Sequence, residues 1–221
     1  MTAVTLIATG LGLAACSVMP TDVHSYEIGD DINQLHVQDP AGKVEVTADS
    51  GTVRVTETIR YSDSDDRPRT SHTTDGGTLR LTNGGCRGHV HVCAVDYQVH
   101  VPAATSVDIT NSAGLVRLTR MAGDLNITSD AGDVEGTGLS SAHATVRDHA
   151  GHISLRYAAA PAQVTVTNDA GAIEVRVPKD GTYAVDASTD AGKTSVSVPR
   201  DPAATRKITA HSDAGKVTIG T

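Results

Sequence analysis

The side chains that could do chemistry recur at one place in a repeated unit of the chain. That place is held by Asp49, Asp130, Asp169, Asp190 and Asp213, and in two further copies by Ser112 and His149. Carboxylates stacked on neighbouring parallel strands lie about 4.8 Å apart, so their repulsion must be offset by solvent, backbone N–H groups or a cation. We expect each aspartate to cap its own turn as an Asx-type bend. The alternative is that Ca²⁺ bridges the carboxylates of adjacent repeats.

The sequence does not predict a dedicated metal site or a cofactor. The Ca²⁺-binding nonapeptide repeat has a Gly-Gly-x-Gly-x-Asp pattern, which this chain lacks. Asp169, Asp190 and Asp213 remain candidate ligands for a bridging cation, but we assign no metal to them. His89 and His91 share one face of an expected strand, and no Cys or acidic residue completes a ligand set around them.

No catalytic constellation stands out in the sequence. There is no Gly-x-Ser-x-Gly elbow, no catalytic Cys–His pairing and no phosphate-binding loop. Asp63, Asp65 and Asp66 cluster in a polar segment, but Arg67 and Arg69 follow them, so we interpret this run as solvated and self-compensating. We predict that the protein is not an enzyme. The alternative is a glycan-active β-helix enzyme acting on cell-wall or extracellular polysaccharide, which would gather acids and a base on one face of adjacent rungs.

The amino terminus reads as an export signal. Residues from Ala3 to Ala15 are apolar or small, a run too short to span a membrane but suited to a signal-peptide core. It ends in Leu13-Ala14-Ala15-Cys16, which resembles the bacterial lipobox, although no Lys or Arg precedes the apolar core. We therefore predict a lipoprotein signal peptide over 1–16, a lipid on Cys16 and a tether over 17–31. The protein would be extracytoplasmic and anchored to the cell membrane.

The two remaining cysteines are a candidate pair. Cys86 and Cys93 lie seven residues apart and flank a short segment that contains glycine. Cysteines that lie this close in an exported protein favour a disulfide. The alternative is a buried pair of free thiols.

A twelve-residue unit organises the chain. It reads apolar-x-apolar-x-x-(Asp/Ser/His)-(Ala/Ser)-Gly-x-apolar-x-apolar, and from Val107 its copies are offset by 18, 19, 20, 21 and 23 residues. The alternation on both sides of the glycine is typical of strands, and glycine permits a sharp turn between them. The predicted turn glycines are Gly51, Gly114, Gly132, Gly151, Gly171, Gly192 and Gly215.

These units predict an all-β protein with one parallel β-solenoid over 32–221. Rungs of about 18–23 residues with two strands each would stack so that apolar side chains form internal columns. Phe and Trp are absent, which favours a narrow core of Val, Ile, Leu and Ala. Residues 62–77 are expected to form an irregular exposed loop. The alternative fold is a meander or sandwich of antiparallel hairpins.

Several of these features together resemble a known family. The lipobox, the glycine-bend repeats, the Cys pair before Tyr97-Gln98-Val99-His100-Val101-Pro102 and the late Asp-Ala-Gly turns are similar to the bacterial "putative adhesin" β-strand-repeat family. The resemblance covers about Val37 to Thr221. It implies a non-catalytic, adhesin-like binding or structural module of the cell surface, and it brings no catalytic residues with it.

Charge narrows the range of partners. The formal net charge is -8 and no basic stripe is visible, which argues against nucleic acid because phosphate neutralisation dominates such binding. Expected partners are the membrane, through the lipid on Cys16, and an envelope protein or cell-wall polymer. Self-association through the open last rung, near Ile219, is also expected because a free strand edge can pair with another chain.

Overall fold

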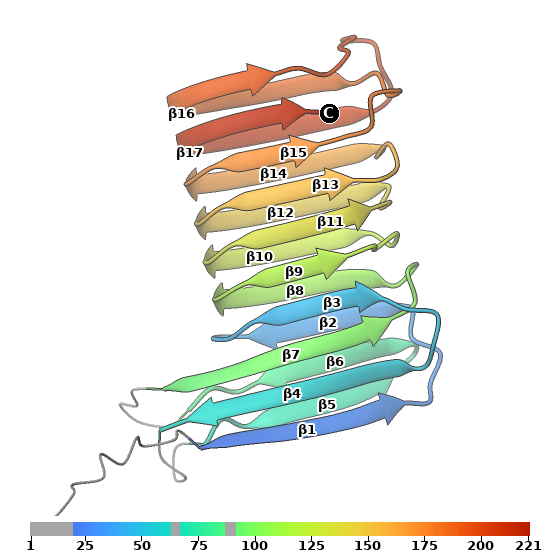
Figure 1. Ribbon diagram of the computed structural model, residues 1–221, viewed down its shortest axis with the longest axis vertical. Helices are drawn as coiled ribbons and strands as arrows, with labels where there is room; N and C mark the ends of the chain where they lie inside the picture. Colours follow the sequence, from blue (N-terminus) through green and yellow to red (C-terminus); the bar gives the residue numbers. More distant parts are fainter. Residues whose placement is uncertain (1–19, 63–66, 87–91) are drawn as a thin grey trace, which may run out of the picture.

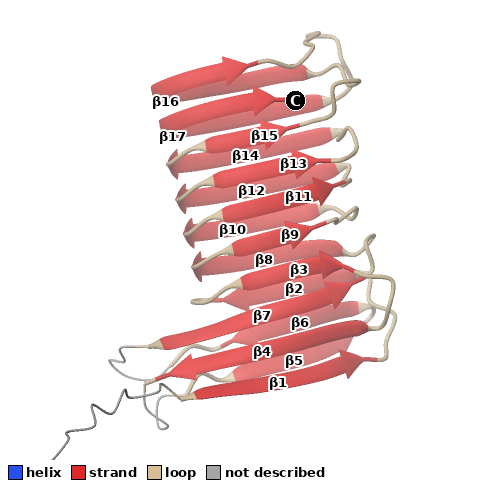
Figure 2. Cartoon of the chain, viewed as in Figure 1, coloured by secondary structure: helices blue, strands red, loops and turns tan. Residues whose placement is uncertain are grey.

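The protein is built from strands. The computed structural model describes residues 20–62, 67–86 and 92–221, and these residues form 17 strands of one sheet and no helix (Figure 2). In chain order the strands are β1 (Thr21–Ile28), β2 (Gln34–Asp39), β3 (Val44–Ala48), β4 (Val53–Tyr61), β5 (Thr70–Asp75), β6 (Thr78–Asn83), β7 (Cys93–Val101), β8 (Ser106–Ala113), β9 (Val116–Thr119), β10 (Leu125–Ala131), β11 (Val134–Leu139), β12 (His143–Ala150), β13 (Ile153–Tyr157), β14 (Gln163–Ala170), β15 (Ile173–Arg176), β16 (Ala184–Val196) and β17 (Lys207–Gly220).

The repeats form the predicted parallel solenoid. Each rung has one strand in a rear layer and one in a front layer, joined at a sharp corner (Figure 1). In the rear layer β8, β10, β12 and β14 pair in parallel, and in the front layer β9, β11, β13 and β15 do the same. The registers match the copies of the unit, because Val107, Leu125 and Ala144 stand beside one another.

The core is a set of aliphatic columns between the two layers. Ile109, Ile127 and Val146 follow one another in the rear layer and are fully buried. Successive side chains of a strand point to opposite faces, so the residues between them stay on the surface. The narrow core predicted from the lack of Phe and Trp is confirmed.

The corner glycines are stacked directly on one another. The amide of Gly132 donates to the carbonyl of Ala150, and a Cβ added to Gly132 would overlap the carbonyl oxygen of Gly114 in the rung below. Gly132 also has a φ of 150°, which side chains rarely adopt. The sequence predicted glycine for its turn geometry, and the structure adds close backbone approach between rungs as a second cause.

One predicted turn glycine lies outside this stack. Gly51 follows β3 at a different corner, and a Cβ there would meet only side-chain atoms of Arg54 and Asp49. The stack ends instead at Gly42, whose carbonyl oxygen a Cβ on Gly114 would overlap. The reason is that β3 is a front-layer strand, so the turn after it belongs to the opposite edge of the rung.

The spatial order of the rungs differs from the chain order at both ends. β17 pairs with β14 and β15 on one side and with β16 on the other, so β16 is the outermost strand. β2 likewise lies between β6 and β8. The prediction of an open last rung near Ile219 is therefore wrong, because Ile219 is fully buried. The free edge belongs to β16.

Side-chain size accounts for this exchange of the last two rungs. β17 presents Ile208, Val217 and Ile219 to the core, and all three are fully buried. The registered residues of β16 include Thr194, which stands beside Val217 and is exposed. Burying the more apolar copy and leaving the more polar copy at the edge maximises the apolar area removed from water.

The amino-terminal end departs from the parallel rule. β1 pairs with β4 and β4 with β7 in antiparallel fashion, and β5 pairs with β6 in the same way. The prediction of a tether over 17–31 is wrong for Thr21–Ile28, because these residues form β1. The sequence hid this strand because, among its alternate positions Asp22, His24, Tyr26 and Ile28, only Ile28 is an aliphatic residue.

The predicted loop over 62–77 is also only partly correct. Its second half contains β5, whose residues are almost all exposed and polar, and which the backbone pairing with β6 holds in place. The ring of Tyr26 stacks on that of His72 with centroids 4.2 Å apart, which joins β1 to β5. The hydroxyl of Tyr26 donates to Glu57 over 2.7 Å. These contacts close the amino-terminal end of the core.

The predicted disulfide between Cys86 and Cys93 is confirmed, and it ties the end of the β6 segment to the start of β7. Cys16, His89 and His91 lie outside the described residues. Within the described part of the chain, no helix is long and apolar enough to cross a membrane.

Candidate functional site

The corner where the glycines stack carries two polar columns, one buried and one exposed. The buried column is formed by the fifth residue of each unit, and includes Asn111, Ser129, Asp148, Asn168 and Ser212. Asn168 donates its amide to the carbonyl of Gly151 over 2.9 Å, and Ser212 donates to the carbonyl of Gly171 over 3.1 Å. These side chains satisfy glycine carbonyls of the neighbouring rung.

This buried column caps the turns, and the sequence prediction assigned that role to the wrong residue. Asn168 Oδ1 accepts a hydrogen bond from the amide of Ala170 over 3.1 Å, which is the Asx-type contact. The predicted capping residue was the next one along, Asp169. The sequence did contain a sign of this capping role. The fifth position is polar in each of these units, although the alternation of side chains along the strand points it into the core.

The exposed column is formed by the sixth residue, and we call it the corner column. It comprises Ser112, Asp130, His149, Asp169, Asp213 and Asp190 in spatial order. His149 lies between two carboxylates, with Nδ1 3.3 Å from Asp130 Oδ1 and Nε2 3.9 Å from Asp169 Oδ2. The imidazole separates two carboxylates that would otherwise stand on more closely spaced rungs.

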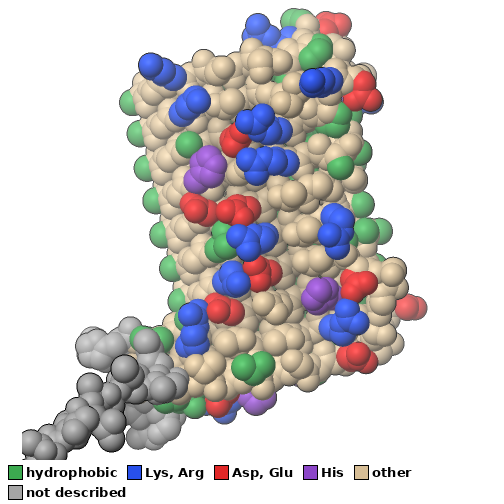
Figure 3. Space-filling model, in the orientation of Figure 1, with side chains coloured by type: hydrophobic (Ala, Val, Ile, Leu, Met, Phe, Trp, Pro, Cys, Tyr) green, Lys and Arg blue, Asp and Glu red, His purple; other side chains and the backbone are tan. Residues whose placement is uncertain are grey.

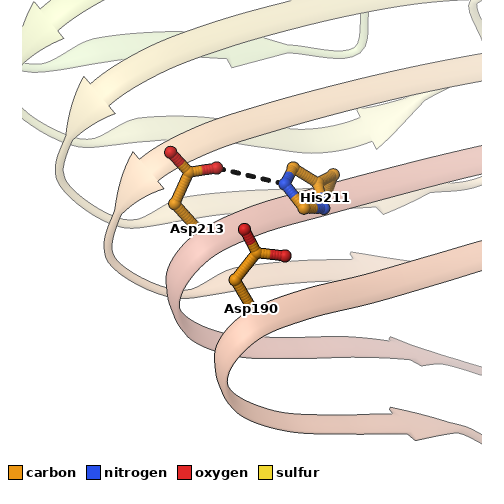
Figure 4. A group of neighbouring side chains, drawn as sticks. All are labelled: Asp190, His211 and Asp213. Carbon is orange, nitrogen blue, oxygen red and sulfur yellow. Dashed lines mark hydrogen bonds and ion pairs between the residues drawn. The ribbon is translucent and has the colours of Figure 1, made fainter.

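The corner column ends in a cluster of three potential metal ligands. Asp190, His211 and Asp213 each offer one ligand atom, and these atoms lie within 4.8 Å of one another. His211 Nε2 is 3.1 Å from Asp213 Oδ1, and Nδ1 is 2.9 Å from the hydroxyl of Ser188. Figure 4 shows the three side chains converging from two adjacent corners. Of the predicted candidates, Asp190 and Asp213 come together here, whereas Asp169 pairs with His149.

His211 was not among the ligands that the sequence predicted. It stands two residues before Asp213 on β17, so both side chains point to the same face of the strand. Thr189 stands beside Ser212 and Ala191 beside Ala214, which places Asp190 next to Asp213. The i, i+2 spacing of His211 and Asp213 was a usable signal, but their proximity to Asp190 depends on how the rungs stack.

The family model named Toastrack DUF4097 matches residues 30–220. The chain belongs to this family. The match covers every described strand except β1, and so includes all the glycine-stacked rungs. No curated protein matches the chain.

Solved structures similar to this chain come from bacteria. A protein from Clostridium sporogenes described as a "putative cell adhesion protein" is 13% identical, with a TM-score of 0.55 over 91% of this chain and 99% of its own. A "putative adhesin" from Bacteroides fragilis is 15% identical, with a TM-score of 0.49 over 91% of this chain and 96% of its own. The first likeness supports the fold predicted from the sequence.

One predicted member of the aspartate column lies elsewhere in the Toastrack domain. Asp49 follows β3 at the opposite edge, where its carboxylate accepts a hydrogen bond from the amide of Ser50 over 2.7 Å and pairs with Arg54 over 2.6 Å. The backbone hydrogen bond from Ser50 and the charge of Arg54 lower the pKa of Asp49. Asp49 does cap its own turn, as expected for the column as a whole.

The front layer of the Toastrack domain carries paired charges. Figure 3 shows basic and acidic side chains interspersed over this face. Arg117 lies between Glu45 and Glu135, with contacts of 2.7 Å and 2.9 Å, and Lys43 also contacts Glu45 over 3.0 Å. Partial burial raises the pKa of Glu45, but Lys43 and Arg117 outweigh it, so the net pKa is lowered. A general acid needs a raised pKa, so Glu45 is not suited to that role.

The carboxyl group whose pKa is raised most lies inside the domain. Asp39 is buried at the start of the buried corner column, and burial raises its pKa to about 7, although Asn83 donates to it over 2.7 Å. Its second oxygen, Oδ2, is buried and has no hydrogen-bond partner among the described residues. Asp39 is shielded from any substrate, so we interpret it as a structural residue.

Proposed function

We propose that this protein is a non-catalytic, lipid-anchored module on the outside of a bacterial cell that binds through the end of its solenoid farthest from the membrane. The observation that carries the proposal is the difference between the two ends of the stack. The amino-terminal end is closed and comes directly after the predicted lipid anchor in the chain. The opposite end is formed by β16, a strand with a free edge.

The anchored end would be the amino-terminal one. Cys16 precedes Thr21, the first residue of β1, by five residues, which span at most about 17 Å. β1 and β5 close this end through the Tyr26–His72 ring stack. A lipid on Cys16 would therefore hold the closed end of the solenoid near the membrane surface.

The opposite end would face outward. The rear layer runs from β5 through β6, β2, β8, β10, β12, β14 and β17 to β16, and eight spacings of 4.8 Å give a height of about 38 Å. Among the described strands, β16 pairs with β17 alone, so its outer edge offers backbone groups that could pair with a strand from a partner. A pocket of about 580 Å³ lies beside this strand, lined by Tyr183, Arg200 and Lys207 among others.

The names of structural neighbours fit such a role. The Clostridium sporogenes protein is described as a cell adhesion protein. For the present chain we propose an envelope protein or a cell-wall polymer as the partner. A second copy of the chain, paired edge to edge through β16, is the other outcome that a binding experiment can return.

The anchor is tested by mass spectrometry of the mature amino terminus together with cell fractionation. We expect a lipid-modified terminus at Cys16 and recovery in the membrane fraction. Cys16→Ser should move the protein to the soluble extracytoplasmic fraction. An unmodified terminus, or one that begins beyond Cys16, would contradict the anchor.

The binding end is tested by a matched pair of substitutions in β16. Ser197 donates its amide to Ile219 of β17, so by alternation along the strand the amide of Thr194 points outward. Thr194→Pro removes that outward donor, whereas Thr194→Val keeps it. In a screen of envelope proteins and cell-wall polymers, and in analytical ultracentrifugation for self-association, the Pro variant should lose binding and the Val variant should keep it. Equal binding by both would exclude the β16 edge as the binding surface.

A further inference from the structure

We propose that Asp190, His211 and Asp213 form a Zn²⁺ site that clamps the edge strand β16 to β17. Asp190 comes from β16, and the other two ligands come from β17. The site lies at the free end of the solenoid, on the exposed side of the glycine corner (Figure 4). This inference does not depend on the proposed function.

The types of ligand atom in this cluster favour Zn²⁺ over Ca²⁺. Ca²⁺ takes oxygen ligands only, so the imidazole of His211 argues against the calcium bridging considered from the sequence. Zn²⁺ accepts imidazole nitrogen and carboxylate oxygen at about 2.0–2.2 Å, and water completes its four ligands in an open site. Around such an ion the ligand atoms are roughly 3.4 Å apart. His211 Nε2 and Asp213 Oδ1 are already 3.1 Å apart, and Asp190 is exposed, with a carboxylate oxygen within 4.8 Å of both.

The surroundings prepare the imidazole for binding. Ser188 Oγ lies 2.9 Å from His211 Nδ1, so this hydroxyl can hold the Nδ1 proton and leave Nε2 to bind the metal. Among the described residues, no Lys or Arg forms an ion pair with Asp190 or Asp213. A divalent cation would therefore supply the positive charge that no Lys or Arg brings to these two carboxylates in the described part of the chain.

The same column contains a natural comparison. His149 also has two aspartate neighbours, but its two ring nitrogens contact different carboxylates, Asp130 and Asp169. The imidazole thus lies between the carboxylates, and one ion cannot reach all three groups. His211 differs because it stands beside the column, two residues from Asp213, so that its Nε2 and both carboxylates converge on one point.

The test is isothermal titration of the untagged protein with Zn²⁺ and, separately, with Ca²⁺. We expect the wild type to bind Zn²⁺, and His211→Ala and Asp190→Asn each to weaken that binding at least tenfold. His149→Ala, the matched control, should bind as the wild type does. Zn²⁺ should raise the thermal midpoint of the wild type and of His149→Ala, because a ligand that binds only the folded state stabilises it, but not that of His211→Ala.

Three results would overturn the proposal. The first is that the wild type does not bind Zn²⁺. The second is that His211→Ala binds Zn²⁺ as tightly as the wild type does. The third is that Ca²⁺ binds as tightly as Zn²⁺ and that His211→Ala does not change the Ca²⁺ affinity. Circular dichroism without metal verifies that the variants are folded. Asp190→Asn changes an exposed side chain on the edge strand, so it keeps the test decisive even if His211→Ala is destabilised.

Discussion

At the scale of single residues, the corner of the solenoid is limited by backbone contact between rungs. The glycines are in register, and the carbonyl oxygen of one occupies the space that a side chain on the next would need. This contact cannot be relieved by a rotamer change, because the obstructing atom is part of the backbone. The corner therefore tolerates no side chain at these positions.

Gly132→Ala should reduce the free energy of unfolding by about 2–3 kcal/mol, near the upper end of single substitutions. The added Cβ would overlap Gly114 O, and the φ of 150° is unfavourable for alanine. Gly29→Ala is the control, since a Cβ there meets nothing within 4 Å, and it should change stability by less than about 0.5 kcal/mol. Urea unfolding measures both. Equal effects of the two substitutions would refute the backbone-contact explanation.

Asp39 should make the protein less stable as the pH rises. Its pKa is about 7 in the folded state because the carboxyl is buried, and about 3.9 in the unfolded chain. Between these values the folded state binds the extra proton, so the free energy of unfolding falls as pH increases from 4 to 7. Above pH 7 the full cost of ionising a buried carboxyl is present.

Asp39→Asn should remove this dependence and stabilise the protein at pH 8 by an amount on the order of 1–2 kcal/mol. Asparagine keeps an acceptor for Asn83, and the same buried column already contains Asn111 and Asn168. Urea midpoints at pH 5 and pH 8 give the comparison. The exposed Asp186→Asn should retain the wild-type slope. A variant of Asp39 with an unchanged slope would contradict a buried neutral carboxyl.

At the scale of elements, the order of the last two rungs is decided by side chains rather than by sequence order. β17 has neighbours on both sides, and β16 has one. Alternation and the recurring glycine were enough to predict the strands, the parallel registers and the narrow core. They could not predict the exchange of rungs, because β16 and β17 carry the same unit and differ only in how apolar their inward residues are.

The same limit applies to the amino-terminal strands and the metal cluster. β1 and β5 are held by backbone pairing and by polar contacts such as Tyr26 with Glu57, so no apolar period marks them. The link between Asp190 and His211 exists only because β16 stacks on β17. Long-range pairing of this kind leaves no local signal in the sequence. The disulfide could be predicted because Cys86 and Cys93 are close in sequence.

Hydrogen exchange should distinguish β17 from β16. The amides of β17 around Ile208 and Val217 lie inside the stack and should be among the slowest in the protein. In β16, amides alternate between β17 and solvent, so about half should exchange at rates typical of an open edge. Residue-resolved exchange by NMR measures this. Slower exchange in β16 than in β17 would contradict the spatial order of the rungs.

Loss of the disulfide should weaken the amino-terminal end selectively. Closing a loop of this length stabilises a fold by about 2–3 kcal/mol in the chain-entropy model, so the double substitution Cys86→Ser with Cys93→Ser should lower stability by about that amount. β7 connects the antiparallel strands to β3, so limited proteolysis should cut first near β4–β7. First cleavage among β10–β15 would show that the disulfide does not support this end.

At the scale of the whole molecule, the solenoid has identical contacts in its middle and special arrangements at both ends. Rungs β10–β11 and β12–β13 contact their neighbours in matching registers, apart from one register shift between Thr137 and Leu139 of β11. Stability in such an array is close to a sum of rung and interface contributions. The middle should therefore accept an additional rung, whereas the ends should not.

Duplicating residues 143–162 directly after Ala162 should give a folded protein that is longer by one rung. The copy has the 20-residue offset that separates Ala144 from Val164 in the native register, so its apolar side chains should continue the existing columns. Small-angle scattering should report a longest dimension greater by about 5 Å, with an unchanged β signal in circular dichroism. An aggregated product, or one with an unchanged length, would count against interchangeable middle rungs.

The exchanged positions of β16 and β17 also define the main competitor of the native fold. β16 carries a copy of the same unit, which would fit the edge of β14 and β15 that β17 covers. The greater apolar content of Ile208, Val217 and Ile219 favours the native order, so substitutions that make these three residues more polar should narrow the free-energy gap between the two registers.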